Sequence, residues 1–166
     1  MKTIIFYATK YGTTAEIAKR IADRIDGATV HDLKNNSIPE LTEFDCVIIG
    51  SSLYVGSIRK EAKSFLARNE EALRGKSVGL FLSGMDTEYT PQTYFEKNFK
   101  QELLAAAKAT CFPGGIYDPE KAGWFDRFLM KAAKKSTVYS DTIDDSKIEQ
   151  FVEAMKLTWE QLNERN

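Results

Sequence analysis

The chain has only two cysteines, Cys46 and Cys111, and a single histidine, His31, among its 166 residues. It contains no CxxC motif and no Cys/His ligand set, so nothing in its composition indicates a zinc site or a disulfide framework. We expect both cysteines to be buried, reduced thiols, as in proteins of a reducing cytosol. We expect His31 to be a polar residue on a strand face rather than a general base.

The chain also lacks a strong charge balance and a long apolar run. Its formal net charge is −1 and its pI is near 5.9, which does not indicate nucleic-acid binding. Lys10 interrupts the first apolar run, so we expect neither a signal peptide nor a membrane span. The length suits one domain, and we expect residues 1–166 to form a single cytoplasmic domain.

A hydroxyl-rich turn between a strand and a helix organises the chain. An apolar segment at residues 4–8 precedes it, and helical apolar spacing over 13–26 follows it. Backbone N–H groups in a first helical turn have no partner within the helix, and the helix dipole adds positive character there. The turn therefore predicts a phosphate-binding loop. Its residues are Thr9, Lys10, Tyr11, Gly12, Thr13 and Thr14.

The same turn has an interpretation that needs no ligand. Thr13 and Glu16 have the spacing of a capping box, in which two side chains satisfy the free N–H groups of a helix start. The choice between a capped helix and a phosphate site depends on the rest of the chain.

Strand and helix patterns alternate along the sequence. Strands are expected at residues 2–8, 28–33, 46–50, 78–83 and 109–112, and helices at 13–26, 59–74, from Pro91 onwards and at 145–164. This alternation predicts an α/β fold with a five-stranded parallel sheet in the order 2-1-3-4-5 and helices on both faces. Residues 115–144 do not fit the alternation.

Ligands of such sheets bind at the carboxyl ends of the strands, where the strand order reverses. The segments 9–14, 51–57 and 84–90 converge there. The second and third segments contain small polar residues and one tyrosine each, and Tyr54 and Tyr89 are placed to flank a flat ring. Alternatively, both tyrosines only cover the end of the sheet. The predicted ring-binding residues are Ser51, Ser52, Leu53, Tyr54, Val55, Gly56, Ser83, Gly84, Met85, Asp86 and Tyr89. A flat heterocycle on a chain that ends in one phosphate describes flavin mononucleotide (FMN).

The three segments resemble the phosphate and ring loops of the flavodoxin-like FMN proteins. The resemblance covers nearly the whole chain. The resemblance implies a three-layer sandwich, FMN as cofactor and redox chemistry at the flavin ring. Residues 90–93 and 124–131 are further similar to the menaquinone-dependent protoporphyrinogen dehydrogenases. That similarity implies a quinone-linked enzyme, for which no acid–base triad is needed because FMN carries the chemistry.

Two functions follow from the resemblance: a flavoenzyme that passes electrons to a quinone, and a flavodoxin-type electron shuttle that docks to redox protein partners. Flavodoxin-type carriers resemble one another in being strongly acidic, whereas this chain is nearly neutral and Arg59 and Lys60 follow its first ring segment. The charge therefore favours the enzyme. A response-regulator-like domain is a third alternative, but the acidic cluster that it needs after the first strand is absent.

Residues 121–135 carry five basic residues and one acid, Asp126, with an aromatic stripe that includes Trp124, Phe125 and Phe128. A basic amphipathic helix of this kind binds anionic membrane surfaces or attracts an acidic substrate. The alternative is a helix that packs its apolar stripe on the sheet and leaves its basic face in solvent.

Overall fold

The structure is a computed structural model that describes residues 1–35, 37–85, 88–132 and 138–163. Its main sheet has six strands: five parallel strands in the order β2-β1-β3-β5-β6, and β4 (Ser57–Ile58), which pairs antiparallel with β3. The parallel strands are β1 (Thr3–Ala8), β2 (Thr29–Asp32), β3 (Cys46–Tyr54), β5 (Ser77–Ser83) and β6 (Ala109–Cys111). The predicted strand order 2-1-3-4-5 is confirmed.

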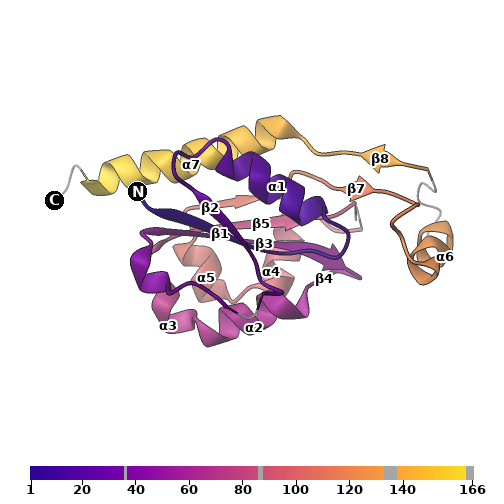
Figure 1. Cartoon of the computed structure of the whole chain (residues 1–166), viewed down its shortest axis with the longest axis horizontal. Coiled ribbons are helices and arrows are strands. Elements are labelled where there is room, and N and C mark those ends of the chain that lie inside the picture. The colour runs from indigo at the N-terminus through magenta and orange to yellow at the C-terminus, as the bar shows by residue number, and fades with distance from the viewer. Residues whose placement is uncertain (36, 86–87, 133–137, 164–166) are drawn as a thin grey trace.

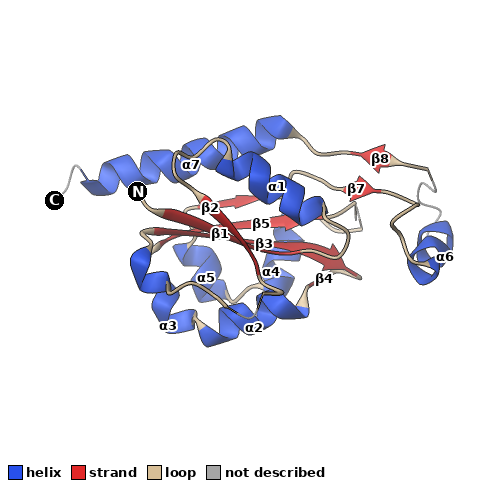
Figure 2. Ribbon diagram, in the orientation of Figure 1, coloured by secondary structure: helices blue, strands red, loops and turns tan. Residues whose placement is uncertain are grey.

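Helices cover both faces of this sheet (Figure 1), as predicted. The helices α1 (Thr13–Ala22) and α7 (Asp145–Asn163) lie on one face. The helices α2 (Lys60–Arg68), α3 (Glu70–Leu73), α4 (Pro91–Asn98) and α5 (Gln101–Ala106) lie on the other, and a short 3₁₀ helix, η1 (Leu41–Glu43), precedes β3. Figure 2 shows the resulting three layers.

The apolar residues form two buried clusters, one on each face of the sheet. Phe6 and Ile49 belong to the cluster under α2 to α5, whereas Ile5 and Ile48 belong to the cluster under α1 and α7. Successive strand residues point to opposite faces, so the continuous apolar runs of β1, β3 and β5 supply both clusters.

Close packing in the sheet fixes Gly50 as glycine. Gly50 pairs with Phe81 across β3 and β5, and a Cβ atom on Gly50 would lie 1.9 Å from Cζ of the Phe81 ring. The ring therefore occupies the space that any side chain at position 50 would need.

Two predicted helices are shorter than their apolar spacing suggested. The first ends at Ala22 instead of residue 26, and tighter turns continue it, with Arg24 N bonded to the Ile21 carbonyl and Ile25 N to the Ala22 carbonyl. These turns keep Ile25 buried, which is why the helical spacing of apolar residues in the sequence continues beyond the end of the helix. The predicted helix over 59–74 is divided at Asn69.

The break at Asn69 has a local cause. The Asn69 side chain donates to the Phe65 carbonyl at 2.8 Å, and its backbone leaves the helical region with φ −113° and ψ 15°. Short polar side chains that bond to nearby backbone groups compete with helix continuation.

Residues 115–132 and 138–144 form an addition that is separate from the main sheet. Strands β7 (Ile116–Tyr117) and β8 (Ser140–Asp141) pair antiparallel, and α6 (Trp124–Ala132) lies between them in sequence. Figure 1 shows α6 beyond the main sheet, at the end towards which β3 and β5 point. This addition therefore lies at the end of the sheet where the ligand site was predicted.

Candidate functional site

The three predicted segments meet at the carboxyl ends of neighbouring strands. β3 lies between β1 and β5 in the sheet, so residues 9–14, 51–57 and 83–89 leave the same edge. A direct contact joins the first and third segments, since Thr14 Oγ1 and Ser83 Oγ lie 2.8 Å apart and both side chains are fully buried.

Gly12 forms the start of α1. It is the N-cap residue and has φ 98°, the left-handed region that favours glycine. Gly12 N donates to Thr9 Oγ1 at 2.9 Å, and Glu16 N donates to the Gly12 carbonyl. The capping-box alternative required Thr13 as N-cap and is wrong, because Thr13 is already the first helical residue. The N-cap residue supplies no side-chain hydrogen bond to this helix start, so the first-turn N–H groups have no partner from the cap residue.

The second segment is a β-hairpin rather than the loop that we predicted. β3 continues to Tyr54 and pairs antiparallel with β4 (Ser57–Ile58), through Leu53 with Ile58 and Tyr54 with Ser57. Val55 and Gly56 form the two-residue turn, with φ 49° and 72°. Two positive φ values match the tight turn that suits the twist of paired strands.

Two serines precede this hairpin and differ in their bonding. Ser51 is fully buried, and its Oγ accepts a hydrogen bond from Arg59 N at 2.9 Å. Ser52 Oγ is buried but has no hydrogen-bond partner in the part of the chain that the structure describes. An unsatisfied buried hydroxyl costs about 1–3 kcal/mol, so Ser52 fits a ligand that presents a polar edge here.

The third segment is only partly described. Gly84 N donates to the Gly114 carbonyl at 3.0 Å, Met85 is half-buried, and the predicted residue Asp86 lies outside the described residues. The Tyr89 ring contacts the edge of Tyr94, with centroids 5.6 Å apart, and Lys97 Nζ lies 3.3 Å from its centroid. Tyr89 thus contacts α4, and no described contact joins it to Tyr54.

Asp126 of α6 joins the first two segments, and sequence reasoning did not assign it to the site. Its carboxylate accepts hydrogen bonds from Lys10 Nζ at 2.5 Å, from Tyr11 OH, and from Tyr54 OH at 3.0 Å. The Asp126 side chain is only 12% exposed. Burial raises its pKa, but the hydrogen bonds from Lys10, Tyr11 and Tyr54 outweigh burial and hold the pKa below 3.8.

Two cations, Lys10 and Arg59, lie near the Tyr54 ring, in addition to the Asp126 carboxylate on its hydroxyl. Lys10 Nζ lies 3.9 Å from the Tyr54 ring centroid, and the Arg59 guanidinium carbon lies 5.8 Å from it. Burial lowers the pKa of Lys10, but hydrogen bonds and charge from Asp126 and Tyr11 outweigh burial. The pKa of Lys10 is therefore raised above its usual value, and Lys10 is a cation at neutral pH. Both distances are within the range of cation–π attraction, which holds the two cations at the Tyr54 ring.

The remaining polar residues that we singled out lie elsewhere. Cys46 and Cys111 are buried and unpaired as thiols, and burial raises the pKa of each to about 12. His31 is half-buried on β2, and its ring centroid lies 5.6 Å from that of Phe6 in an edge-to-face arrangement. Within the described residues no group of His, Cys, Asp or Glu side chains is arranged to hold a metal ion.

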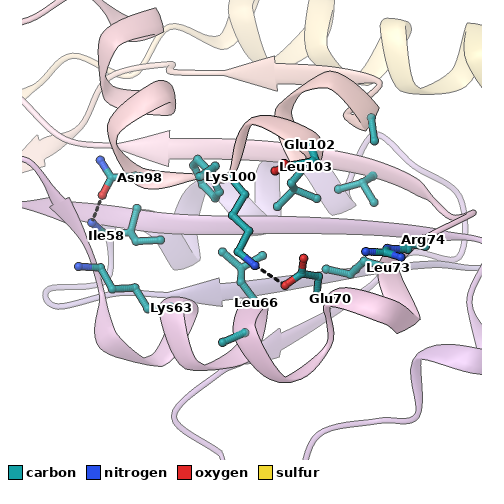
Figure 3. Close-up of a pocket in the computed structure, with 14 residues that line it drawn as sticks. Ile58, Lys63, Leu66, Glu70, Leu73, Arg74, Asn98, Lys100, Glu102 and Leu103 are labelled. Carbon is teal, nitrogen blue, oxygen red and sulfur yellow. Dashed lines mark hydrogen bonds and ion pairs between the residues drawn. The ribbon is translucent and has the colours of Figure 1, made fainter.

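A cavity of about 240 Å³ lies between α2 and α3 on one side and α4 and α5 on the other (Figure 3). Its walls are mostly apolar, and the Lys100–Glu70 ion pair crosses its mouth. None of the residues that line it belongs to the predicted FMN segments, although Ile58 and Asn98 border the hairpin. The cavity is therefore separate from the predicted FMN segments.

The parallel sheet has helices on both faces, and the first helix begins where the strand order reverses. Proteins with this arrangement form a class that binds phosphate-bearing cofactors at that helix start. The chain belongs to the flavodoxin family, since the family model for the flavodoxin domain matches residues 4–144. It is accordingly an FMN-binding flavoprotein with a redox function.

Individual relatives agree with this family. The chain is 25% identical over 164 residues to protoporphyrinogen IX dehydrogenase [quinone] of Escherichia coli K12, covering 85% of this chain and 88% of that protein. It is 25% identical to a flavodoxin of Synechocystis, covering 93% and 91%. A Fusobacterium nucleatum flavodoxin mutant bound to FMN is 28% identical, with a TM-score of 0.50 over 66% of this chain and 68% of that one.

The fit of FMN to this site rests on three features of the chain itself. The start of α1 offers N–H groups, Thr9 offers a hydroxyl whose oxygen already accepts from Gly12 N, and Ser52 Oγ has no partner among the described residues. Together they suit an anionic phosphate and the polar edge of a ring. Nowhere in the described chain is a helix both long and apolar enough to cross a bilayer.

Proposed function

We propose that the chain is an FMN-dependent oxidoreductase of the quinone-linked protoporphyrinogen dehydrogenase type. The FMN phosphate binds at residues 9–14, and the ring lies between residues 51–57 and 83–90. The start of α1 carries this proposal, because its left-handed Gly12 leaves first-turn N–H groups open at the strand-order reversal. When bound, FMN supplies the electron-transfer chemistry, and the protein orients it.

The phosphate loop acts through hydroxyls and amides. Thr9 accepts from Gly12 N and keeps its own proton for a phosphate oxygen, while Thr13 and Thr14 begin the helix beside it. The Thr14–Ser83 hydrogen bond holds the first turn of α1 against the end of β5. The loop is thereby preorganised, and little ordering is required when the dianion binds.

The ring segments act through Tyr54, Ser52 and the hairpin backbone. Tyr54 is held by its hydroxyl on Asp126, so its ring has a fixed face for stacking. Backbone groups near Ser52, Gly56 and Gly84 are placed at the edge of the sheet to bond the polar edge of the ring. Tyr89 flanks the other face by reorienting from its contact with Tyr94.

The local charge supports an enzyme rather than a carrier. Negative charge beside a flavin disfavours its anionic reduced form and lowers its potential. Here Lys10 and Arg59 lie near the Tyr54 ring, and one anion, Asp126, is bonded to Lys10 and to the Tyr54 hydroxyl. The three groups leave one net positive charge, which favours the reduced anion and a milder potential. A milder potential suits a quinone acceptor, and the E. coli relative is named for a quinone.

An electron shuttle that docks to redox protein partners is the second candidate. The Synechocystis flavodoxin supports it, since the match covers most of both chains. A redox titration separates the two functions. Widely separated one-electron potentials with a very low second value indicate the shuttle, whereas a milder two-electron potential with quinone turnover indicates the enzyme.

We further propose that residues 121–135 contact an anionic membrane surface, where a quinone is dissolved. Trp124 and Phe128 of α6 are 81% and 62% exposed, so these aromatics do not pack on the sheet. Lys121 and Arg127 are exposed beside them, and the segment carries a formal charge of +4. Exposed aromatics beside basic residues suit a headgroup region.

Vesicle co-sedimentation tests the membrane contact. We expect the FMN-loaded protein to pellet with vesicles of anionic lipid, and Lys121→Glu/Lys131→Glu to remain in the supernatant. Lys19→Glu/Lys63→Glu is the matched control, because these exposed lysines lie on α1 and α2. Equal sedimentation of wild type and the α6 variant would remove the membrane contact from the proposal.

The absorption spectrum of the purified protein tests the cofactor, and turnover tests the reaction. We expect flavin bands, and reoxidation of the reduced protein by a menaquinone analogue faster than by an acceptor protein. Oxidation of protoporphyrinogen then tests the substrate. Flavin bands without reoxidation by the quinone would support the shuttle instead.

A further inference from the structure

The hairpin between β3 and β4 has a strained turn. Val55 has φ 49°, a left-handed conformation that β-branched residues rarely adopt, and its side chain is 79% exposed. Left-handed backbone costs an ordinary residue about 1–2 kcal/mol, and packing of the exposed side chain offsets little of that cost. Other contacts must therefore hold this turn in place.

Asn98, the last residue of α4, supplies those contacts. Its Oδ1 accepts a hydrogen bond from Ile58 N at 2.8 Å, and its Nδ2 donates to the Gly56 carbonyl at 2.9 Å. The same Nδ2 donates to the Tyr94 carbonyl at 2.9 Å, which fixes the amide against its own helix. Figure 3 shows the Asn98–Ile58 bond beside the cavity. One side chain thus bonds two backbone groups on the β4 side of the turn.

We propose that Asn98 is a positioning residue that sets the redox preference of the flavin site by holding the Gly56 carbonyl. The inference rests on the proposed FMN site, in which the hairpin backbone borders the ring. A carbonyl held against α4 cannot turn towards another donor without breaking its bond to Asn98.

The redox consequence follows from the chemistry of the ring. Oxidised flavin presents N5 as a hydrogen-bond acceptor. In the two-electron-reduced ring, N5 would carry a proton from solvent and would be a hydrogen-bond donor. A Gly56 carbonyl that is free to turn could accept from N5–H, whereas a carbonyl oriented towards Asn98 would first have to leave that bond. Asn98 therefore disfavours the reduced ring relative to the oxidised ring, and its removal has the opposite effect.

The ratio of the dissociation constants for oxidised and dithionite-reduced FMN measures this effect. We expect Asn98→Ala to raise the ratio Kd(oxidised)/Kd(reduced) by about three- to tenfold, the equivalent of one hydrogen bond. Asn69→Ala is the matched control, because its amide also bonds a helix carbonyl but lies at the α2–α3 break. We expect this control to lower stability and leave the ratio unchanged.

A purely structural role gives a different result. Asn98→Ala could weaken the binding of oxidised and reduced FMN by the same factor, or leave both affinities unchanged. In either case Asn98 does not set the redox preference and the inference fails. Absence of FMN binding by the wild type is a separate failure, that of the proposed site.

Hydrogen exchange of the wild-type protein without FMN tests the role of Asn98 even if the Asn98→Ala variant does not fold. In the wild-type protein we expect the Asn98 side-chain amide protons and the Ile58 N–H to exchange slowly with solvent. Gln92, an exposed amide on the same helix, is the internal reference. Exchange of Asn98 as fast as that of Gln92 would show that the amide does not hold the turn, and would overturn the inference.

Discussion

Thr14 Oγ1 lies 2.8 Å from Ser83 Oγ, and this buried contact ties the start of α1 to the end of β5. The two residues are 69 positions apart, and each belongs to a different predicted cofactor segment. The contact fixes the phosphate loop relative to the ring segments before any ligand arrives.

Replacing Thr14 by valine keeps its shape and removes the hydroxyl. We expect Thr14→Val to lower the free energy of unfolding by about 1–3 kcal/mol, because Ser83 Oγ is left buried and unsatisfied. FMN affinity should fall as well. Urea titration and flavin fluorescence measure the two effects. Thr29→Val, at an exposed strand position, is the control, and equal losses in both variants would contradict a special role for the Thr14–Ser83 contact.

Gly12 allows a charge test of the phosphate loop. A Cβ atom at Gly12 meets no protein atom within 4 Å, so there is open space at Cβ, but a new residue must adopt φ 98°. Gly12→Ala and Gly12→Asp share this backbone cost, about 1–2 kcal/mol. We expect Gly12→Asp to abolish FMN binding through repulsion of the phosphate, and Gly12→Ala to weaken it only modestly. Gly12→Asp protein that stays yellow would show that the phosphate lies elsewhere.

Asp126 gives the site a pH-dependent contribution to stability. Its folded-state pKa is depressed below 3.8, so the carboxylate stabilises the fold above that value and loses its contribution as pH falls through the lower folded pKa. We expect Asp126→Asn to lower stability by about 1 kcal/mol at pH 7. Urea titrations from pH 7 to pH 3 should show this difference shrinking only below pH 4. A difference that is constant down to pH 3 would contradict an ionic role.

Val55 is a position where a substitution should stabilise the protein. Asparagine tolerates positive φ better than valine, so we expect Val55→Asn to raise the free energy of unfolding by about 1 kcal/mol. Val30→Asn is the matched control, because Val30 is also exposed but lies in extended β2. There the loss of a β-branched residue should destabilise. If both variants shift the urea midpoint in the same direction, the turn at Val55 is not strained.

The fold was predictable because its signals are local. The apolar runs at β3 and β5 indicate strands buried on both faces, and the pattern of the first turn locates the ligand end of the sheet. The strand order follows from right-handed connections. The predicted helix start at Pro91 is confirmed, and the Thr90 side chain caps it by accepting from Thr93 N.

The parts that were missed depend on distant contacts or on strain. Asp126 lies 116 residues from Lys10, and no local pattern indicates that they pair. The hairpin turn at Val55 has no Asn-Gly or Asp-Gly signal, since valine disfavours the conformation that the turn requires. Nothing in the sequence distinguishes Asn98 from an ordinary residue at a helix end, because its hydrogen bonds to the hairpin join distant segments.

The proposed function requires the FMN phosphate to lie at the start of α1. A comparison of FMN with riboflavin tests this position directly. The two ligands share the ring and differ in the phosphate. We expect the wild-type protein to bind FMN on the order of 100-fold more tightly than riboflavin by fluorescence titration, the equivalent of one or two charge-assisted hydrogen bonds. Equal dissociation constants for FMN and riboflavin would contradict the assignment of residues 9–14 as the phosphate site.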